Sequence, residues 1–236
     1  MKKVILLFMC LSISFSASSQ SFIGAWESIS TNKKGDKVKT IVTFAEGYQV
    51  MTSYEAKTGK FISTNGGSWK LEGDTVTEKI EFDSSNPDFV GTEVSFKVFN
   101  NGSEMGIVGA KERFKRIDNG TPGKLQGAWL MSGRVRDGKE QMRDTSGPRK
   151  TMKVLSGTRF QWIAYNTETK KFMGTGGGTY TTVNGKYTEN IEFFSRDNSK
   201  AGLHLVFDYT LKDGIWNHKG FSSKGDAMHE IWSVRK

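Results

Sequence analysis

An internal repeat constrains the fold of this chain more than any other feature of its sequence. Residues 39–97 align without a gap to residues 150–208 at a constant offset of 111 positions, and 17 of these 59 pairs are identical. Unrelated segments of average composition would share only ~5% of their residues. Because a repeat of this length corresponds to one structural unit, the sequence predicts two copies of the same small domain.

Short motifs mark where each copy begins and ends. Both copies open on Gly-Ala-Trp, at 24–26 and 127–129, and close on Glu-x-aromatic, at 112–114 and 230–232. The run of turn-forming residues from Asp118 to Gly123 separates the copies and is typical of a linker. The boundaries that follow are a first unit at 21–117, a linker at 118–124 and a second unit at 125–236. Because the linker is short, we expect the two units to touch.

Residues 1–20 have the three parts of a secretory signal peptide. Two lysines form a basic start, residues 4–15 are mostly apolar, and small residues follow at 16–19. The apolar run is shorter than the ~20 residues that a membrane helix requires. We therefore predict cleavage near residue 20, a secreted or periplasmic protein, and no integral membrane segment after cleavage.

The processed chain would contain no cysteine, because Cys10 is the only one in the sequence. Such a chain can form no disulfide even in an oxidising compartment, so its stability must come from packing. The formal net charge is +9, which falls to +7 without Lys2 and Lys3. Lys and Arg are scattered along the chain, a pattern that indicates a solubilising surface and no nucleic-acid partner. Composition leaves the oligomeric state open.

Short segments rich in β-branched and aromatic residues alternate with turns of Gly, Asn, Asp and Lys. Each copy contains about eight such segments and no convincing long helix. Turns such as 100–102, 184–185 and 212–214 suit hairpins, since Gly and Asn accept positive φ. Eight short antiparallel strands linked by hairpins predict an all-β fold of two tandem up-and-down barrels. The interior of an eight-stranded barrel holds packed side chains or one small ligand.

Three motifs of the second copy resemble a lipocalin-like domain family of exported bacterial proteins with no established function. They are Gly-Gly-Thr-Tyr at 177–180, Tyr-Thr-Glu-Asn-Ile-Glu at 187–192 and Glu-Ile-Trp at 230–232. The first copy departs from these motifs, with Trp69, Val76 and Phe114 in place of Tyr180, Tyr187 and Trp232. The Gly-x-Trp that opens both copies is similar to the lipocalin (calycin) pattern. The resemblance covers nearly all of the chain after residue 20 and implies two lipocalin-like barrels that carry a ligand in a cavity.

The resemblance also implies how the barrels are closed. In lipocalins the tryptophan of Gly-x-Trp closes one end of the barrel, and an arginine from the last strand packs across it. By resemblance, Trp26 and Trp129 take the first role. Arg113 or Arg116 would take the second role in the first copy, and Arg235 in the second.

The sequence contains no recognisable catalytic, metal or cofactor motif. The three histidines, His204, His218 and His229, lack metal-ligand spacing and all lie in the second copy. The glycine run at 174–178 lacks the Lys and the helix of a phosphate-binding loop, so we interpret it as a tight strand corner. No catalytic residue, metal ligand or cofactor is therefore assigned.

Two equivalent glutamates, Glu78 and Glu189, are the most informative polar residues. Side chains on a strand alternate between its faces, and Glu189 shares its face with Ile191. This apolar face should point into the barrel, where a carboxylate is costly unless it is paired or hydrogen-bonded. Each glutamate either binds an inward Arg, Tyr or Trp as a structural element, or anchors a ligand or acts as a general acid or base. Glu81 and Glu192 fall on the opposite face and should be solvated.

Aromatic residues concentrate in the second copy, where Trp162 and Tyr187 replace Met51 and Val76 of the first. They either fill the barrel or line a cavity. The leading hypothesis is an exported binding protein that holds a small apolar or amphipathic ligand in at least one of its barrels. If only one barrel binds, the aromatic residues favour the second. The expected ligand-binding residues are Trp129, Tyr165, Tyr180, Tyr187, Glu189, Trp216 and Trp232.

Two alternatives remain open at this point. The first is an interaction module at the cell surface or in the periplasm, with filled barrels and an exposed apolar or aromatic patch. The second is a small-molecule isomerase or lyase that uses Glu189 with His218 or His229 as an acid–base pair across one cavity. Glu230 is a further candidate acid, because it shares a face with Trp232.

Overall fold

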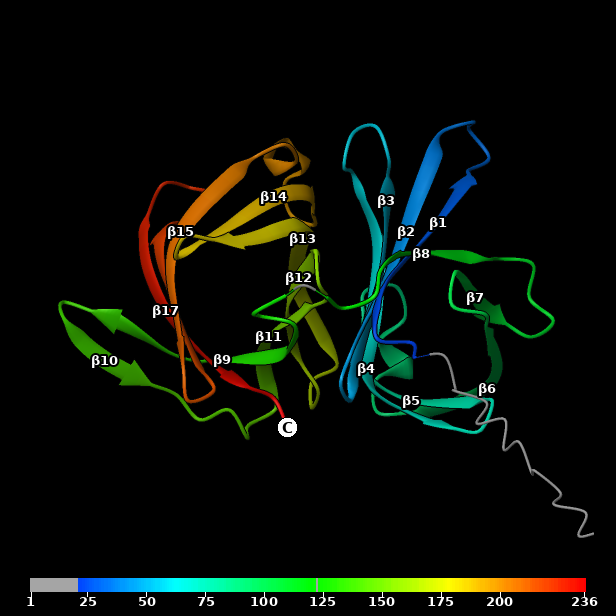
Figure 1. Cartoon of the computed structure of the whole chain (residues 1–236), viewed down its shortest axis with the longest axis horizontal. Coiled ribbons are helices and arrows are strands. Elements are labelled where there is room, and N and C mark those ends of the chain that lie inside the picture. Colours follow the sequence, from blue (N-terminus) through cyan, green and yellow to red (C-terminus); the bar gives the residue numbers. More distant parts are fainter. Residues whose placement is uncertain (1–20, 122) are drawn as a thin grey trace, which may run out of the picture.

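The structure of the protein, a computed structural model, describes residues 21–121 and 123–236. It consists of two closed antiparallel β-barrels in tandem, which lie side by side (Figure 1). This confirms the predicted all-β fold with two up-and-down barrels, and the architecture fits a lipocalin-like fold. The predicted signal peptide at 1–20 lies outside the described residues. Among those residues, no helix has the length and apolar character that crossing a membrane requires.

The first barrel is a meander of eight strands in which each strand pairs with the next. The strands are β1 (Gly24–Thr31), β2 (Lys37–Ala45), β3 (Tyr48–Glu55), β4 (Phe61–Glu72), β5 (Thr75–Asp83), β6 (Glu93–Asn100), β7 (Glu104–Ile107) and β8 (Phe114–Asp118). A 3-10 turn at Pro87–Phe89 joins β5 to β6. Pairing between β1 and β8 closes the barrel.

The second barrel repeats this plan and adds a short strand. Its strands are β9 (Gly127–Arg136), β10 (Lys139–Met142), β11 (Arg149–Leu155), β12 (Arg159–Asn166), β13 (Lys171–Val183), β14 (Lys186–Phe194), β15 (His204–Lys212), β16 (Ile215–Phe221) and β17 (Ala227–Val234). Pairing between β9 and β17 closes the barrel, while β9 runs on to form an arm with β10 (Figure 1). A 3-10 turn at Asn198–Lys200 matches that of the first barrel.

The closed end of each barrel is built around the tryptophan of Gly-x-Trp. The indole N–H groups of Trp26 and Trp129 each donate to a backbone carbonyl four residues earlier, at 2.8 Å. The guanidinium of Arg116 lies 3.9 Å from the ring centroid of Trp26, so Arg116 rather than Arg113 covers the first tryptophan. The expectation that Arg235 covers Trp129 is wrong. Arg235 follows the last strand and points away from its own barrel, toward the first one.

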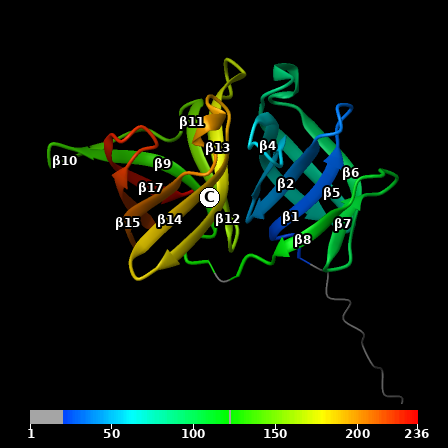
Figure 2. The same ribbon diagram turned by 90° about the horizontal axis from the view of Figure 1, so that it is seen from above.

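Residues that are identical in the two copies meet where the barrels touch. The Tyr54 hydroxyl of the first barrel donates to Glu192 of the second, and the Tyr165 hydroxyl of the second donates to Glu81 of the first. The offset of 111 relates Tyr54 to Tyr165 and Glu81 to Glu192. The two bonds are therefore equivalent, and the contact has approximate twofold symmetry. Figure 2 shows the two barrel walls facing each other across this contact.

Aromatic stacking follows the same symmetry. Phe61 stacks on its own equivalent, Phe172, with ring centroids 6.0 Å apart and planes 11° apart. Each interface tyrosine also packs on a phenylalanine of the other barrel. The centroid separations are 4.9 Å for Tyr54–Phe193 and 5.0 Å for Tyr165–Phe82. The tandem barrels thus pack as the two halves of a symmetric dimer would.

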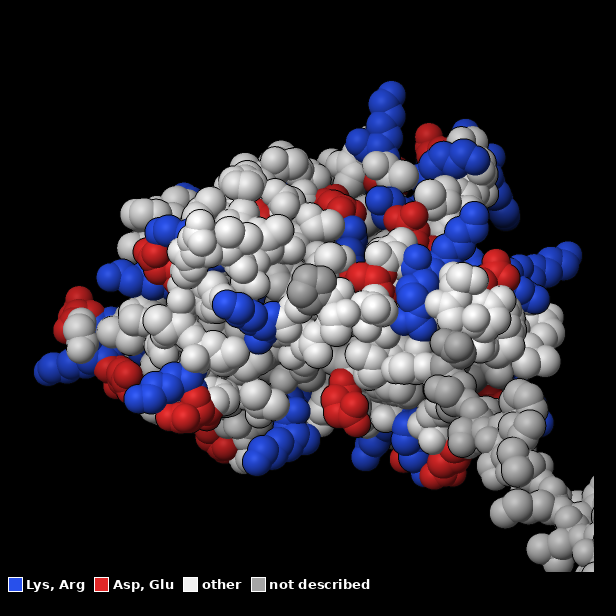
Figure 3. Space-filling model, viewed as in Figure 1, with Lys and Arg blue, Asp and Glu red and all other residues white. Residues whose placement is uncertain are grey.

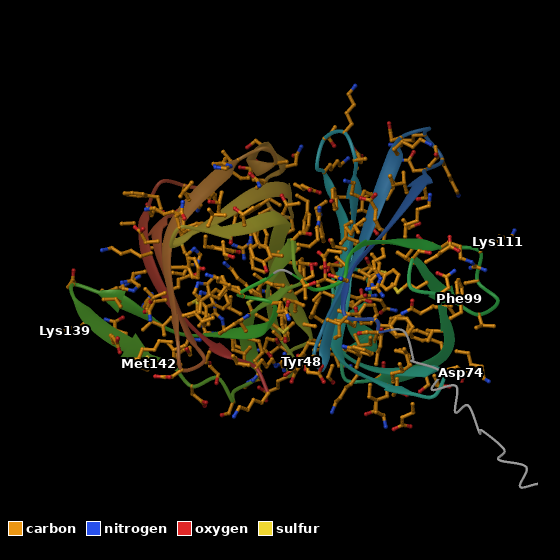
Figure 4. The ribbon with its side chains drawn as sticks, viewed as in Figure 1. Tyr48, Asp74, Phe99, Lys111, Lys139 and Met142 are labelled. Carbon is orange, nitrogen blue, oxygen red and sulfur yellow. The ribbon has the colours of Figure 1, made fainter. Side chains whose placement is uncertain are left out.

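Both arginines at this contact come from the second barrel. Arg159 donates two hydrogen bonds to Glu192, at 2.7 and 2.9 Å, and Arg235 donates two to Glu81, each at 2.8 Å. Arg235 also lies 4.1 Å from the ring centroid of Tyr48, which Figure 4 labels between the two barrels. The prediction that Glu81 and Glu192 are solvated is therefore wrong. Strand alternation places them outside their own barrel, but the other barrel covers that face.

The connection between the barrels is held at its start by Asp118. Its carboxylate accepts hydrogen bonds from the hydroxyls of Ser156 and Thr158, each at 2.6 Å, in the turn between β11 and β12. Burial acts to raise the pKa of Asp118, but the hydrogen bonds from Ser156 and Thr158 outweigh it and hold the pKa below its ordinary value. This contact fixes the end of the first barrel to the closed end of the second.

The repeated glycine pair allows the long strands β4 and β13 to bend. Register shifts occur between Gly66 and Gly67 and between Gly177 and Gly178. A Cβ atom at Gly178 would lie 1.9 Å from the carbonyl oxygen of Asn190, which is too close for any side chain. The glycine run predicted to form a strand corner is therefore a β-bulge inside a continuous strand.

Candidate functional site in the second barrel

The second barrel contains a cavity of about 270 Å³. Its wall is largely apolar, with side chains from β12, β14, β15 and β17, including Trp162, Ile191, Phe194, Leu205, Phe207 and Met228. Ser222 and Ser223, in the turn between β16 and β17, also line it. Since Trp129 pairs with the opposite end of β17, the cavity extends toward the end of the barrel away from that tryptophan.

A buried ion pair lies in the wall of this cavity. The Lys153 ammonium is 2.8 Å from the Glu189 carboxylate, and the two side chains are only 4% and 6% exposed. The Tyr187 hydroxyl donates to the same carboxylate oxygen at 2.8 Å. The inward position expected for Glu189 is thus observed, and its partners are a lysine and a tyrosine. A buried ion pair of this kind depends on such additional hydrogen bonds to offset the cost of desolvation.

Aromatic rings surround the Lys153 ammonium. It lies 5.1 Å from the ring centroid of Tyr187, 4.9 Å from that of Trp216 and 5.0 Å from that of Trp232. The negative face of an aromatic ring attracts a cation, most strongly where water is excluded. The rings therefore help the second barrel to hold a positive charge in an apolar interior.

His218 and Glu230, on β16 and β17, form a second polar group in the lining. His218 is 1% exposed, and its Nδ1 lies 3.7 Å from a Glu230 carboxylate oxygen, which is too long for a hydrogen bond. Neither ring nitrogen of His218 has a hydrogen-bond partner within residues 21–121 and 123–236. The Trp232 indole N–H donates to Glu230 at 3.1 Å. One imidazole donor and one acceptor are thus left without a partner in the described part of the chain.

Burial favours the uncharged forms of both groups. It holds the pKa of His218 well below its usual range, and the charge of Lys153 adds to this effect. Burial also raises the pKa of Glu230, although Lys153 acts in the opposite direction. At neutral pH the imidazole is neutral, so the cavity offers an uncharged hydrogen-bonding group beside the Lys153–Glu189 pair.

The structure divides the seven residues expected at the site into three sets. Glu189 and Trp232 line the cavity, and Tyr187 and Trp216 pack against Lys153 beside it. Trp129 and Tyr180 belong to the closed end, where the Tyr180 hydroxyl donates to the backbone of Ser156.

Tyr165 lies on the outer wall of the second barrel, in the interface with the first, so its predicted place in the cavity is wrong. Side chains alternate along β12, so that Tyr165 points outward and Trp162 points inward.

Lys153 is the important residue that sequence reasoning missed. It stands at the repeat position that Val42 occupies in the first copy, on the inward face of β11. A lysine that replaces a valine at an inward position was the available signal. It went unnoticed because surface lysines are common in this chain.

The other histidines do not belong to the cavity. His229 contacts Asn217 at 3.3 Å, and His204 contacts Asn190 at 2.7 Å. Across the described part of the chain, no cluster of three or more His, Cys, Asp or Glu side chains could hold a metal ion. The chemistry available in the cavity is therefore that of Lys153, Glu189, His218 and Glu230.

The first barrel contains a smaller cavity of about 190 Å³. Glu78, the equivalent of Glu189, lines it. The lining is otherwise mainly apolar and includes Phe44, Phe96 and Val42. Both barrels thus combine an inward glutamate with a cavity.

No known protein family matches the chain, and no characterised protein matches its sequence. The likeness to lipocalins consequently rests on barrel topology and on the tryptophan-closed ends described above.

Proposed function

We propose that this chain is an exported binding protein that holds a small amphipathic molecule in the cavity of its second barrel. One observation carries the proposal. A fully buried histidine, His218, lines a largely apolar cavity, and neither of its ring nitrogens has a hydrogen-bond partner among the described residues. Buried polar groups are normally hydrogen-bonded, and an unpaired one costs stability. A ligand with an apolar body and one hydroxyl or similar polar group would match the lining and pair with one nitrogen of the imidazole.

The cavity argues against the filled-barrel alternative. An interaction module would need its barrels only as packed supports for surface loops. Both barrels instead contain a cavity, and in the second barrel four ionisable side chains line it. The larger cavity lies near the lower end of the volumes typical of small-molecule sites, which favours a compact ligand over a long lipid.

The acid–base alternative takes a different form in the structure. Lys153 and Tyr187 both bind one carboxylate oxygen of Glu189, which makes Glu189 an anchor. His229 contacts Asn217 and does not line the cavity. His218 and Glu230 both line it, and Nδ1 of the imidazole lies 3.7 Å from a Glu230 carboxylate oxygen.

Surface charge supports a small-molecule ligand over a nucleic acid. Lys and Arg side chains are spread over the face shown in Figure 3, with Asp and Glu between them. Nucleic-acid sites concentrate basic residues in one patch or stripe. Export is part of this proposal because residues 1–20 have the pattern of a signal peptide.

Calorimetric titration with 4-ethylphenol and ethylbenzene tests the role of His218. We expect His218→Phe, which keeps the ring but removes both nitrogens, to weaken 4-ethylphenol binding about tenfold, the equivalent of one buried hydrogen bond. Ethylbenzene, which has no hydroxyl, should bind the wild type and the variant within about twofold. Equal affinities of 4-ethylphenol for the two proteins would show that the imidazole does not bind the ligand.

A further inference from the structure

The first barrel lacks the internal cation that the second barrel contains. Glu78 and Glu189 are equivalent and both point inward. The position of Lys153 is taken by Val42, because Val42 pairs with Trp26 in the same register in which Lys153 pairs with Trp129. The first barrel therefore keeps the inward carboxylate, which is half-buried, but has no ammonium group beside it.

The Glu78 carboxylate has no partner of its own. Within residues 21–121 and 123–236, no side chain or backbone group forms a hydrogen bond or ion pair with it. It is also the only titratable group in the lining, since the residues from the other strands are apolar or carry uncharged amides. Burial alone raises the pKa of Glu78 to about 7, so a large fraction of the carboxylate is charged at neutral pH.

Two further polar side chains line the same cavity. Gln49 is 2% exposed, and Asn65 is half-buried on the adjacent strand. Neither amide forms a side-chain hydrogen bond with another described residue. A carboxylate and two amide oxygens are acceptors, and an ammonium group carries three N–H donors. The rings of Phe44 and Phe96 add apolar and aromatic surface that suits a cation with a compact apolar body.

We propose that the cavity of the first barrel binds a small organic amine in its protonated form. The ammonium of the ligand pairs with Glu78, as the Lys153 ammonium pairs with Glu189 in the second barrel. The apolar part of the amine occupies the space between Val42 and Phe96. The two barrels would then have different ligands: a neutral amphipathic molecule in the second and an organic cation in the first.

Calorimetric titration with 2-phenylethylammonium, and with 2-phenylethanol as the neutral analogue, tests this proposal. We expect the amine to bind the wild type at least about tenfold more tightly than the alcohol, because only the amine gains an ion pair. Glu78→Gln should remove this preference while keeping the side-chain shape. Glu72→Gln, at an exposed position of the same barrel, should leave it unchanged.

A second variant moves the Lys153 arrangement into the first barrel. Val42→Lys places an internal ammonium beside Glu78 and should reduce amine binding by at least about tenfold. In the wild type, lowering the pH below about 7 should weaken amine binding by about tenfold per unit, since a proton then competes for Glu78. His218→Phe should not affect amine binding, which separates this site from the one in the second barrel.

Three results would overturn the proposal. The first is equal affinity of the wild type for 2-phenylethylammonium and 2-phenylethanol. The second is amine binding that survives Glu78→Gln. The third is the absence of any amine binding at millimolar concentration and pH 8, where Glu78 is ionised.

Discussion

Replacing Glu189 with glutamine is expected to lower the free energy of unfolding by about 3 kcal/mol, because it leaves the Lys153 ammonium buried without a counter-charge. The two groups are 2.8 Å apart and almost inaccessible to solvent. Glutamine has nearly the same size as glutamate, so the loss of stability comes from removal of the charge and not from a new cavity. Urea denaturation at pH 7 measures this loss.

Two controls make this result specific to the ion pair. The double variant Lys153→Met with Glu189→Gln removes both charges and should recover stability to within about 1 kcal/mol of the wild type. Glu78→Gln removes the equivalent carboxyl, which lacks a cation. Its pKa is raised to about 7, so the folded state binds more protons than the unfolded state between about pH 4.5 and 7 and loses stability as the pH rises.

Glu78→Gln should therefore stabilise the protein at pH 8 by up to about 3 kcal/mol. Destabilisation by both glutamine variants to the same extent would contradict the different environments of the two glutamates.

Replacing Tyr165 with alanine is expected to lower the free energy of unfolding by about 3–5 kcal/mol. Tyr165 is fully buried, although it lies outside its own barrel, and it packs against Phe82 of the other barrel. Its loss opens a cavity in the contact between the barrels and removes a partner of Glu81. Differential scanning calorimetry should show a lower transition temperature and separate transitions for the two barrels.

Tyr165→Phe is the matched control for that experiment. It removes only the hydroxyl and leaves the two hydrogen bonds between Arg235 and Glu81, so we expect a loss of about 1 kcal/mol. Tyr54→Ala, at the equivalent position, should behave like Tyr165→Ala. A change below about 1 kcal/mol in Tyr165→Ala would mean that the barrels are not coupled through this contact.

Much of the fold could be predicted from the repeat. Turn residues divide each copy into strands whose observed ends lie close to the expected ones, as at Tyr48–Glu55 and Arg159–Asn166. The arm formed by β9 and β10 was not predicted. Figure 4 shows Lys139 and Met142 on it, and these exposed polar and apolar residues lack the alternation that marks a strand packed on a core.

The contact between the barrels could not be predicted, because alternation reveals only which face of a strand leaves its barrel. Tyr54, Phe61 and Glu81 are identical to their equivalents in the second copy because these positions meet across the approximate twofold axis. Phe61 faces its own equivalent, and Tyr54 and Glu81 each contact the equivalent of the other. The identity of outward residues in the two copies was a sign of this interface. Glu81 and Glu192 were instead expected to be solvated, and Tyr165 to bind a ligand, because alternation does not show what covers an outward face.

The candidate site was predictable in part for the same reason. Inward positions on β14 were identified through Glu189 and its apolar neighbours. The pairing of Lys153 with Glu189 depends on the distance between β11 and β14 across the barrel. The alternation of side chains along one strand does not give that distance. Trp216 and Trp232 were expected to contact a ligand. In the structure both contact Lys153, and Trp232 also lines the cavity.

Native mass spectrometry of the protein purified gently from its own host tests the central claim most directly. We predict a small-molecule adduct that is lost on denaturation. Leu205→Trp, which fills the cavity of the second barrel, should abolish it. Val206→Trp, which adds the same indole at the next residue on the exposed face of β15, should retain it. A bare polypeptide mass without an adduct in all three proteins, or an adduct that persists in Leu205→Trp, would contradict a ligand-carrying second barrel.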